Sequence, residues 1–240
     1  YAGIEKGYFR EEGLDLRLME VPTGKAGLDA VLAGQADCAG AADTPVARAV
    51  IDGKPISVVA TIADIQEAIM IIAKKESGIA KPGDLKGKTI GVTFGAGAQF
   101  FLHIYLVANH INPDEVRLVN VPPDRTVDAL LSGEVQAVCT WSPYKLSLRE
   151  KLGSDAVVLS DPALYLQTFN IVTTKDYLKT NPERVRKLLR ALLRASTFIQ
   201  HHPDETRTIL SKYLGTVGNL YQKEWDDYIF TVVLDQGLLL

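Results

Sequence analysis

Apolar and polar residues change their period several times along the chain, and these changes mark strands and helices. Residues 14–22, LDLRLMEVP, alternate apolar and polar side chains and stop at a proline, which predicts a strand. Residues 114–122, DEVRLVNVP, repeat the pattern 100 positions later. Between residues 181 and 203, apolar residues recur every three or four positions, which predicts a helix with Pro182 in its first turn.

The two strand patterns belong to an internal repeat of about 100 residues. Asp29–Gly34 (DAVLAG) matches Asp128–Gly133 (DALLSG), and each is typical of a helix end closed by glycine. Further extended segments keep this register: 56–61 with 156–161, and 70–75 with 170–175. Each half is therefore predicted to alternate strands and helices and to form a mostly parallel sheet with helices on both faces.

The ends of the chain depart from the repeat. The second half opens with a strand, Thr89–Phe94, followed by a glycine-rich turn and a helix, whereas the first half starts inside the matching helix. We therefore expect the partner of the Thr89–Phe94 strand to lie upstream of Tyr1, in a longer protein. After residue 175 the pattern predicts helices, which include the segments 204–214, 220–230 and an apolar helix-like run over 230–240.

Composition narrows the range of functions. The 240 residues suffice for two lobes, and 26 basic against 29 acidic residues without charged blocks argue against a nucleic-acid or membrane-surface partner. Cys38 and Cys139 are the two cysteines; we expect free thiols, with a disulfide between them as the alternative. No serine or cysteine has a histidine nearby in sequence, so we expect no catalytic residues, cofactor or metal.

Candidate ligand contacts follow from the rule that open α/β sheets bind ligands at the carboxyl ends of strands, beside helix N-termini. The rule selects Ala42, Asp43 and Thr44 in the first half, and Trp141 with Ser142 in the second. Asp43, Thr44 and Ser142 are equally consistent with ordinary helix caps. Trp141 suits stacking on a ligand, with packing between the lobes as the alternative.

Two further groups complete the candidate site. The small residues of the glycine-rich turn allow a ligand to approach backbone N–H groups, although the turn lacks the ending of a phosphate loop. The segments 64–67 and 167–170 occupy equivalent repeat positions and are predicted to cross between lobes along the floor of a cleft, with solvated linker as the alternative. The residues added are Gly95, Ala96, Gly97, Ala98, Gln99, Gln66, Glu67, Phe169 and Asn170.

Several motifs together resemble the periplasmic solute-binding proteins of ABC importers, in the branch of sulfonate, taurine, nitrate and thiamine-pyrimidine-precursor receptors. They are EKGYFREEGLDLRL, GLDAVLAGQAD, ESGIAKPGDLKGKTIGV and LLSGEVQAVCTWSPY. The resemblance implies a type II periplasmic-binding-protein fold, an α/β architecture of two lobes with a hinge and a ligand cleft. The expected lobes are 1–63 plus 171–240, lacking the first strand, and 64–170.

The resemblance also implies a function. It predicts a non-enzymatic, monomeric receptor, located in the periplasm or otherwise outside the bacterial cytoplasm, that delivers a small molecule to an ABC permease. It supports residues 42–44, 95–99, 141–142 and 169–170 as pocket positions. The alternative is the sensor domain of a membrane signalling protein, with a signalling partner. A fold relative is an enzyme of thiamine-pyrimidine synthesis, but it needs a cysteine-rich segment, and two isolated cysteines argue against that activity.

The ligand is harder to predict. Many relatives carry an acidic residue where this chain has Ser142, and serine or threonine where it has Ala96 and Ala98. A sulfonate or nitrate would then depend mainly on helix N-termini. A heterocyclic or amine-bearing metabolite could stack on Trp141 and hydrogen-bond to Asp43 or Asn170, and the sequence favours this class.

Overall fold

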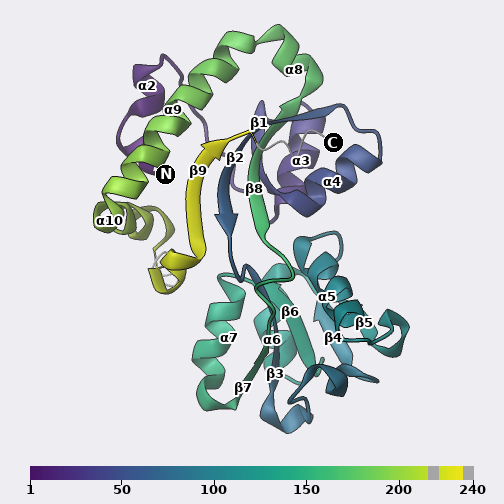
Figure 1. Cartoon of the computed structure of the whole chain (residues 1–240). Helices are drawn as coiled ribbons and strands as arrows, with labels where there is room; N and C mark the ends of the chain where they lie inside the picture. Colours follow the sequence, from purple (N-terminus) through teal and green to yellow (C-terminus); the bar gives the residue numbers. More distant parts are fainter. Residues whose placement is uncertain (216–221, 235–240) are drawn as a thin grey trace. The chain divides into compact units, whose positions relative to one another are not determined.

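The chain forms two compact units, which a computed structural model describes over residues 1–215 and 222–234 (Figure 1). Unit 1 comprises Tyr1–Ile65 and Gln167–Leu240, and unit 2 comprises Gln66–Leu166. The chain thus crosses between the units twice. Residues 64, 65 and 167–170, placed in the second lobe by the sequence analysis, lie in strands of unit 1, because the pairing of these strands extends to Ile65 opposite Gln167.

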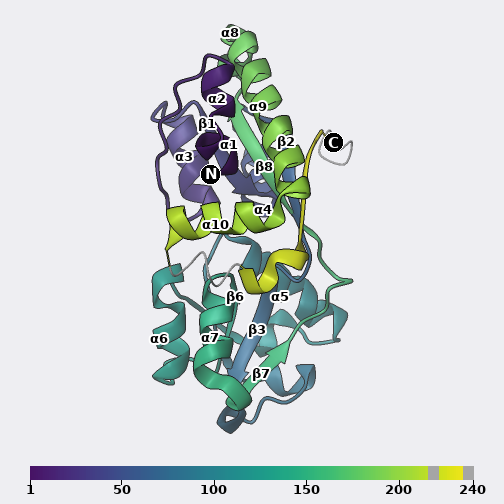
Figure 2. The same ribbon diagram turned by 90° about the vertical axis from the view of Figure 1, so that its left-hand side faces the viewer.

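Unit 1 is built on a four-stranded sheet of order β1-β8-β2-β9. Its described elements in chain order are α1 (Ala2–Glu5), α2 (Tyr8–Glu11), α3 (Gly24–Leu32), β1 (Cys38–Ala42), α4 (Asp43–Ile51), β2 (Ile56–Ile65), β8 (Gln167–Thr174), α8 (Lys175–Thr180), α9 (Pro182–His201), α10 (Pro203–Leu214), the 3₁₀ helix η6 (Gln222–Asp227) and β9 (Tyr228–Val233). Helices α3 and α4 lie on one side of this sheet and α9 on the other (Figures 1 and 2).

The sheet of unit 1 is antiparallel in every described pair, so the predicted parallel sheet is wrong for this unit. The predicted strand at 14–22 is also wrong, because this segment pairs with no strand among the described residues. In the second repeat the matching segment pairs with the strand that begins at Thr89, which has no counterpart in the first half of the sequence. Consequently Leu16, Leu18 and Met19 are exposed.

The C-terminal part of unit 1 corrects a second prediction. Helices α9 and α10 are confirmed, but over 222–230, the described part of the helix predicted at 220–230, the prediction is wrong: a short 3₁₀ helix is followed by β9. The sequence YIFTVV of β9 is rich in aromatic and β-branched residues, and β2 offers it a free edge. Gln200 of α9 donates to the Phe230 carbonyl at 2.7 Å and ties the strand to the helix. Residues 235–240 of the predicted terminal run lie outside the described residues.

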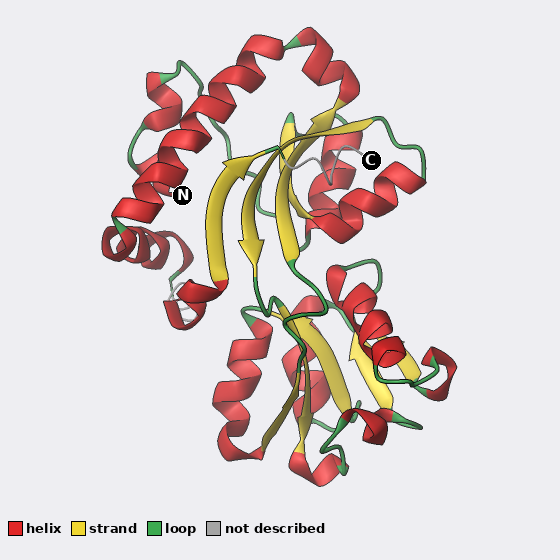
Figure 3. Cartoon of the chain, in the orientation of Figure 1, coloured by secondary structure: helices red, strands yellow, loops and turns green. Residues whose placement is uncertain are grey.

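Unit 2 contains a five-stranded mixed sheet of order β5-β4-β6-β3-β7 (Figure 3). The strand β4 pairs in parallel with β5 and β6, whereas β3 runs antiparallel to β6 and β7, so the parallel prediction holds for only half of this sheet. Its main elements are β3 (Ile69–Lys74), β4 (Thr89–Val92), α5 (Gly97–Ala108), β5 (Arg117–Asn120), α6 (Thr126–Leu131), β6 (Ala137–Trp141), α7 (Tyr144–Leu152) and β7 (Ala156–Leu159), with short 3₁₀ helices at Lys75–Ser77, Pro82–Leu85, Pro113–Glu115, Pro123–Arg125 and Gly153–Asp155.

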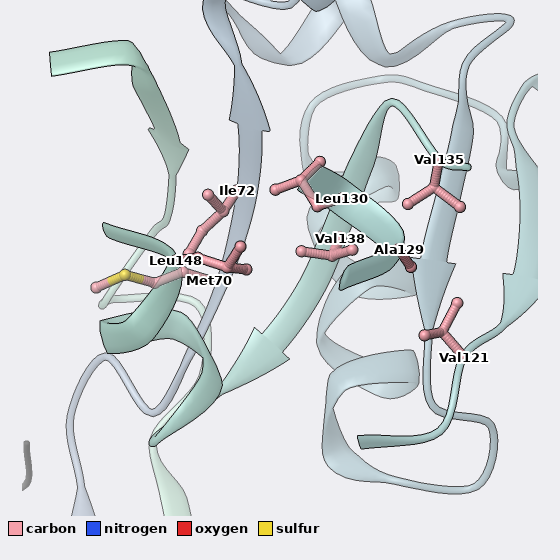
Figure 4. Close-up of a cluster of buried hydrophobic side chains, with 8 residues drawn as sticks. All are labelled: Met70, Ile72, Val121, Ala129, Leu130, Val135, Val138 and Leu148. Carbon is pink, nitrogen blue, oxygen red and sulfur yellow. The ribbon is translucent and has the colours of Figure 1, made fainter. Parts of the chain in front are cut away.

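The strands β3 and β6 are buried on both faces, which explains their nearly continuous apolar sequence. Because side chains alternate along a strand, Ile72 and its partner Val138 point toward α6 and α7, where they join a buried cluster. Ile71 and its partner Cys139 point to the opposite face, where α5 packs. Figure 4 shows the cluster on the α6 and α7 side: Met70, Ile72, Val121, Ala129, Leu130, Val135, Val138 and Leu148.

No helix within residues 1–215 and 222–234 is long and apolar enough to cross a bilayer.

The core of unit 2 offers a matched pair for measuring packing energy on one helix. Leu130 is fully buried in the cluster, whereas its neighbour Leu131 is 37% exposed. We expect Leu130→Ala to lower the free energy of unfolding by about 2–5 kcal/mol through lost burial and a cavity. Leu131→Ala should cost less than about 1 kcal/mol. Urea unfolding followed by circular dichroism measures both, and equal losses would contradict this core assignment.

Candidate functional site

In unit 1, the candidate residues gather where β1 ends and α4 begins. Ala42, the last residue of β1, pairs with Phe169 of β8, and Ala41 pairs with Asn170. Residues more than 120 positions apart in sequence thereby become neighbours through backbone pairing. The structure brings together the predicted Ala42, Asp43 and Thr44 with Phe169 and Asn170.

The carboxylate of Asp43 is already engaged within unit 1. Its Oδ1 accepts hydrogen bonds from the Thr44 backbone N–H at 2.6 Å and from the Thr44 hydroxyl at 3.2 Å. Its Oδ2 accepts from the Thr168 N–H at 3.4 Å. The helix cap is Ala42 rather than Asp43, which lies in the first helical turn, where its negative charge is favourable. Asp43 therefore joins the start of α4 to β8.

Asn170 is fully buried and holds two strands together. Its Oδ1 accepts from the Thr61 hydroxyl at 2.8 Å, and its Nδ2 donates to the Thr168 hydroxyl at 2.9 Å. Thr61 is also buried, so these polar groups satisfy one another away from water. The network supports the strand that carries Phe169.

Phe169 is half-buried because β1 carries a glycine beside it. A Cβ at Gly40 would lie 2.9 Å from Cε1 of the Phe169 ring, closer than real contacts allow. Gly40 thus lets the ring lie against β1. The face that remains uncovered makes Phe169 available for an apolar contact with a ligand.

In unit 2, the glycine-rich turn leads directly into α5. Gly95 has a positive φ of 76°, which glycine adopts without strain. Gln99 folds back so that its Oε1 accepts from the Gly95 N–H at 2.8 Å. Gly97 and Ala98 are buried, whereas Ala96 and Gln99 are half-buried and Gly95 is exposed. The hydrogen bond between Gln99 and Gly95 thus stabilises the turn, and part of the turn remains exposed.

The end of β6 lies beside this turn. The Cys139 thiol donates to the Ala98 carbonyl at 3.2 Å, so α5 begins against β6 two residues before Trp141. Trp141 is half-buried and meets the Tyr144 ring edge-on, with 6.1 Å between ring centroids. Ser142 is 6% exposed, so its side chain has little access to solvent. The structure therefore groups Trp141 with the predicted glycine-rich turn.

The helices at the candidate turns start without a side-chain cap. Within the described residues, no side chain hydrogen-bonds the first turn of α4, α5 or α7 from the cap position, which Ala42, Ala96 and Pro143 occupy. Thr23 and Thr174, by contrast, cap α3 and α8. Uncapped helix N-termini present backbone N–H groups and a partial positive charge, which suit an anion or a carbonyl oxygen.

Sequence reasoning missed Lys145, the second residue of α7. It is 1% exposed, and its Nζ donates to the Glu67 carbonyl oxygen at 2.5 Å. Glu67 itself has a positive φ of 44°, and its carboxylate accepts from the Ser160 hydroxyl at 3.1 Å. Gln66 is exposed at the start of unit 2. A lysine in the first turn of an amphipathic helix usually reaches solvent, so the pattern carried no signal of its burial.

Neither cysteine is paired in the structure, and Cys38 and Cys139 lie in different units. Burial raises the pKa of both thiols, and for Cys139 the rise is large. No group of three or more histidine, cysteine, aspartate or glutamate side chains able to hold a metal occurs in the described part of the chain.

A model of one protein family matches residues 1–206 of this chain, under the description NMT1/THI5 like. The chain belongs to the NMT1/THI5-like family. The taurine-binding periplasmic protein of Escherichia coli (strain K12) is 25% identical over 85% of the chain and 63% of its own length. The 4-amino-5-hydroxymethyl-2-methylpyrimidine phosphate synthase THI5 of Saccharomyces cerevisiae is 28% identical over 82% of the chain and 62% of its own length. This family member spans less than two thirds of the curated relatives it matches.

Solved structures show the same fold. The alkanesulfonate-binding protein SsuA from Xanthomonas axonopodis pv. citri, bound to MOPS, has a TM-score of 0.86 and 20% identity, covering 99% of this chain and 83% of its own. The nitrate-binding protein NrtA from Synechocystis PCC 6803 has a TM-score of 0.66 and 17% identity, covering 88% of this chain and 62% of its own. The predicted periplasmic-binding-protein fold and family resemblance are confirmed.

The buried polar network of unit 1 predicts strong coupling between two residues. Thr61→Val and Asn170→Leu each leave a buried partner unsatisfied, at a cost of about 1–3 kcal/mol. In the double variant the Thr61–Asn170 bond is lost only once. Urea unfolding of the four proteins should therefore give a coupling free energy of about 0.5–3 kcal/mol. Strictly additive losses would contradict the network.

The raised thiol pKa values predict low reactivity in the folded chain. A higher pKa reduces the thiolate fraction at pH 8, and Cys139 is buried as well. Iodoacetamide should therefore modify Cys139 at least about tenfold more slowly than a free cysteine. Mass spectrometry of peptides measures the rate for each thiol, and the unreduced denatured chain should yield two thiols. Fast labelling of Cys139 in the folded protein would refute its burial.

Proposed function

We propose that the protein is an extracytoplasmic receptor that binds a small metabolite and delivers it to an ABC importer. The observation that carries this proposal is the placement of the candidate residues: in each unit they collect where a strand ends and an uncapped helix begins. Relatives named as taurine-binding and solved structures named as alkanesulfonate- and nitrate-binding support the same role.

The proposed ligand contacts come from each unit. Unit 1 supplies Thr44 and the Phe169 ring, with the start of α4 that Ala42 and Asp43 shape. Unit 2 supplies Trp141, with Ser142 beside it, and the backbone of the glycine-rich turn from Gly95 to Gln99. Gln66 and Glu67 lie at the first crossing, and Asn170 acts through its support of Phe169.

We further propose that the ligand is a small organic anion of the sulfonate type. The sequence favours an amine or heterocycle that hydrogen-bonds to Asp43 or Asn170. Both groups already make internal hydrogen bonds, which reduces their capacity for a ligand. The Asp43 carboxylate already occupies the start of α4, so the N-termini of α5 and α7, which have no side-chain cap, are the proposed donors for an anion.

The proposed role is non-enzymatic, monomeric and without a cofactor or metal. The relatives named as binding proteins support it, while the synthase relative makes an activity assay a necessary control. The names of these relatives do not favour the sensor-domain alternative. An ABC permease is the partner that this role requires.

A thermal-shift panel tests the ligand class. Taurine or an alkanesulfonate at a hundred times its dissociation constant should stabilise the chain by about 2.7 kcal/mol. Pyrimidines and simple amines should leave the unfolding temperature unchanged. Stabilisation by a pyrimidine alone would refute the sulfonate proposal, and no stabilisation by any compound of the panel would refute a receptor for these ligand classes.

The two tryptophans of the chain provide a matched control. Trp141→Ala should abolish the shift caused by taurine or an alkanesulfonate, because the ring and its apolar contact are lost. Trp225→Phe should retain the shift, since Trp225 packs on Phe230 and Arg207 within unit 1. A full response in Trp141→Ala would remove that residue from the site.

A further inference from the structure

Glu67 follows the first crossing between the units and bonds to the segment that leads to the second crossing. It lies two residues after Ile65, the last residue of unit 1 before the first crossing. Its carboxylate accepts from Ser160, the residue that follows β7 and opens the segment leading to the second crossing. Two segments 93 positions apart are thereby joined at one residue.

The backbone of Glu67 is in a conformation that its side chain disfavours. A φ of 44° lies in the left-handed region, which a residue with a Cβ adopts less favourably than the right-handed region. Such a conformation persists only where surrounding contacts hold it. The Lys145 ammonium supplies one of these contacts, because it donates to the Glu67 carbonyl oxygen from a fully buried position.

Lys145 also belongs to the candidate site. It lies in the first turn of α7, which begins directly after Trp141, Ser142 and Pro143. Trp141 in turn pairs with Ile69, two residues beyond Glu67. The Lys145–Glu67 bond therefore closes a ring of contacts within unit 2. The ring runs from Glu67 along the chain to Ile69 at the start of β3, across the strand pair to Trp141, and through the start of α7 back to Lys145.

We propose that Lys145 is a positioning residue of the ligand site: its bond to the Glu67 carbonyl fixes the turn that joins both crossings and the position of Trp141. This inference rests on the proposed receptor function. It assigns Lys145 no contact with the ligand. Instead, Lys145 holds the chain entry of unit 2 and the strand end that carries Trp141 in one arrangement.

Substitutions in a Trp225→Phe background, where Trp141 is the single tryptophan and is excited selectively at long wavelength, test the proposal. Lys145→Met removes the donor and keeps the apolar stem, so the Glu67 turn relaxes. Acrylamide quenching of Trp141 should rise several-fold, and the thermal shift caused by taurine should be lost. Lys151→Met, an exposed lysine of the same helix, should change neither.

A second substitution separates positioning from mere stability. Glycine adopts positive φ as readily as negative φ, so Glu67→Gly in the Lys145→Met chain should restore the turn. Quenching should then fall back and the response to taurine should partly return. If Lys145 only stabilises the fold, Glu67→Gly gives no rescue, because glycine at position 67 restores neither the buried ammonium nor its packing. That outcome, or unchanged quenching in Lys145→Met, overturns the proposal.

Two outcomes keep this test distinct from that of the function. A parent chain that does not respond to taurine contradicts the proposed ligand, while the quenching series still decides the role of Lys145. Should Lys145→Met fail to fold, Lys145→Gln keeps a polar group at the buried position and carries its donor on a shorter side chain than the one that bonds the Glu67 carbonyl. It should raise the quenching of Trp141, and an unchanged value overturns the proposal.

Discussion

The structure of unit 1 depends on one strand, β8, which forms backbone hydrogen bonds along both of its edges. Its partners β1 and β2 precede unit 2 in the chain, whereas β8 follows it. Thr61 and Asn170, which meet inside this sheet, are 109 positions apart. Closing so long a loop costs conformational entropy before any contact forms, so the buried pairing must offset that cost. The sheet of unit 1 is therefore completed by a strand that follows unit 2 in the sequence.

The same strand explains why the proposed site uses Asn170 as a support rather than as a ligand contact. The Asn170 side chain lies on one face of the sheet, where its amide bonds to Thr61 and Thr168. Phe169, the preceding residue, faces the other way because side chains alternate along a strand. One residue of the pair is fully buried and the other is half-buried. A strand end can thus present an aromatic ring with precision only because its neighbour is locked into a polar network.

In unit 2, a buried charged side chain, Lys145, fixes the position of a neighbouring segment. An ammonium group removed from water is costly unless it is hydrogen-bonded, so Lys145 constrains whatever accepts its bond. Here the acceptor is the carbonyl of a residue with positive φ at the entrance of the unit. The uncapped helix starts nearby add partial positive charge without adding side chains. The proposed ligand site of this unit therefore depends on backbone N–H groups and on the buried Lys145 ammonium. The sequence pattern does not indicate the burial of this ammonium.

The sequence by itself determined the two-unit organisation, the positions of β2, β3, β7 and β8, and the turns that carry Asp43 and Trp141, because the repeat and the alternation of apolar residues are local properties. Only the tertiary structure decided which strands pair and in which direction. Residues 14–22 have the composition of a strand yet find no partner, and β9 is a strand because β2 offers a free edge. The burial of Asn170 and Lys145 was likewise beyond the sequence, since burial is a property of the packed units and not of local spacing.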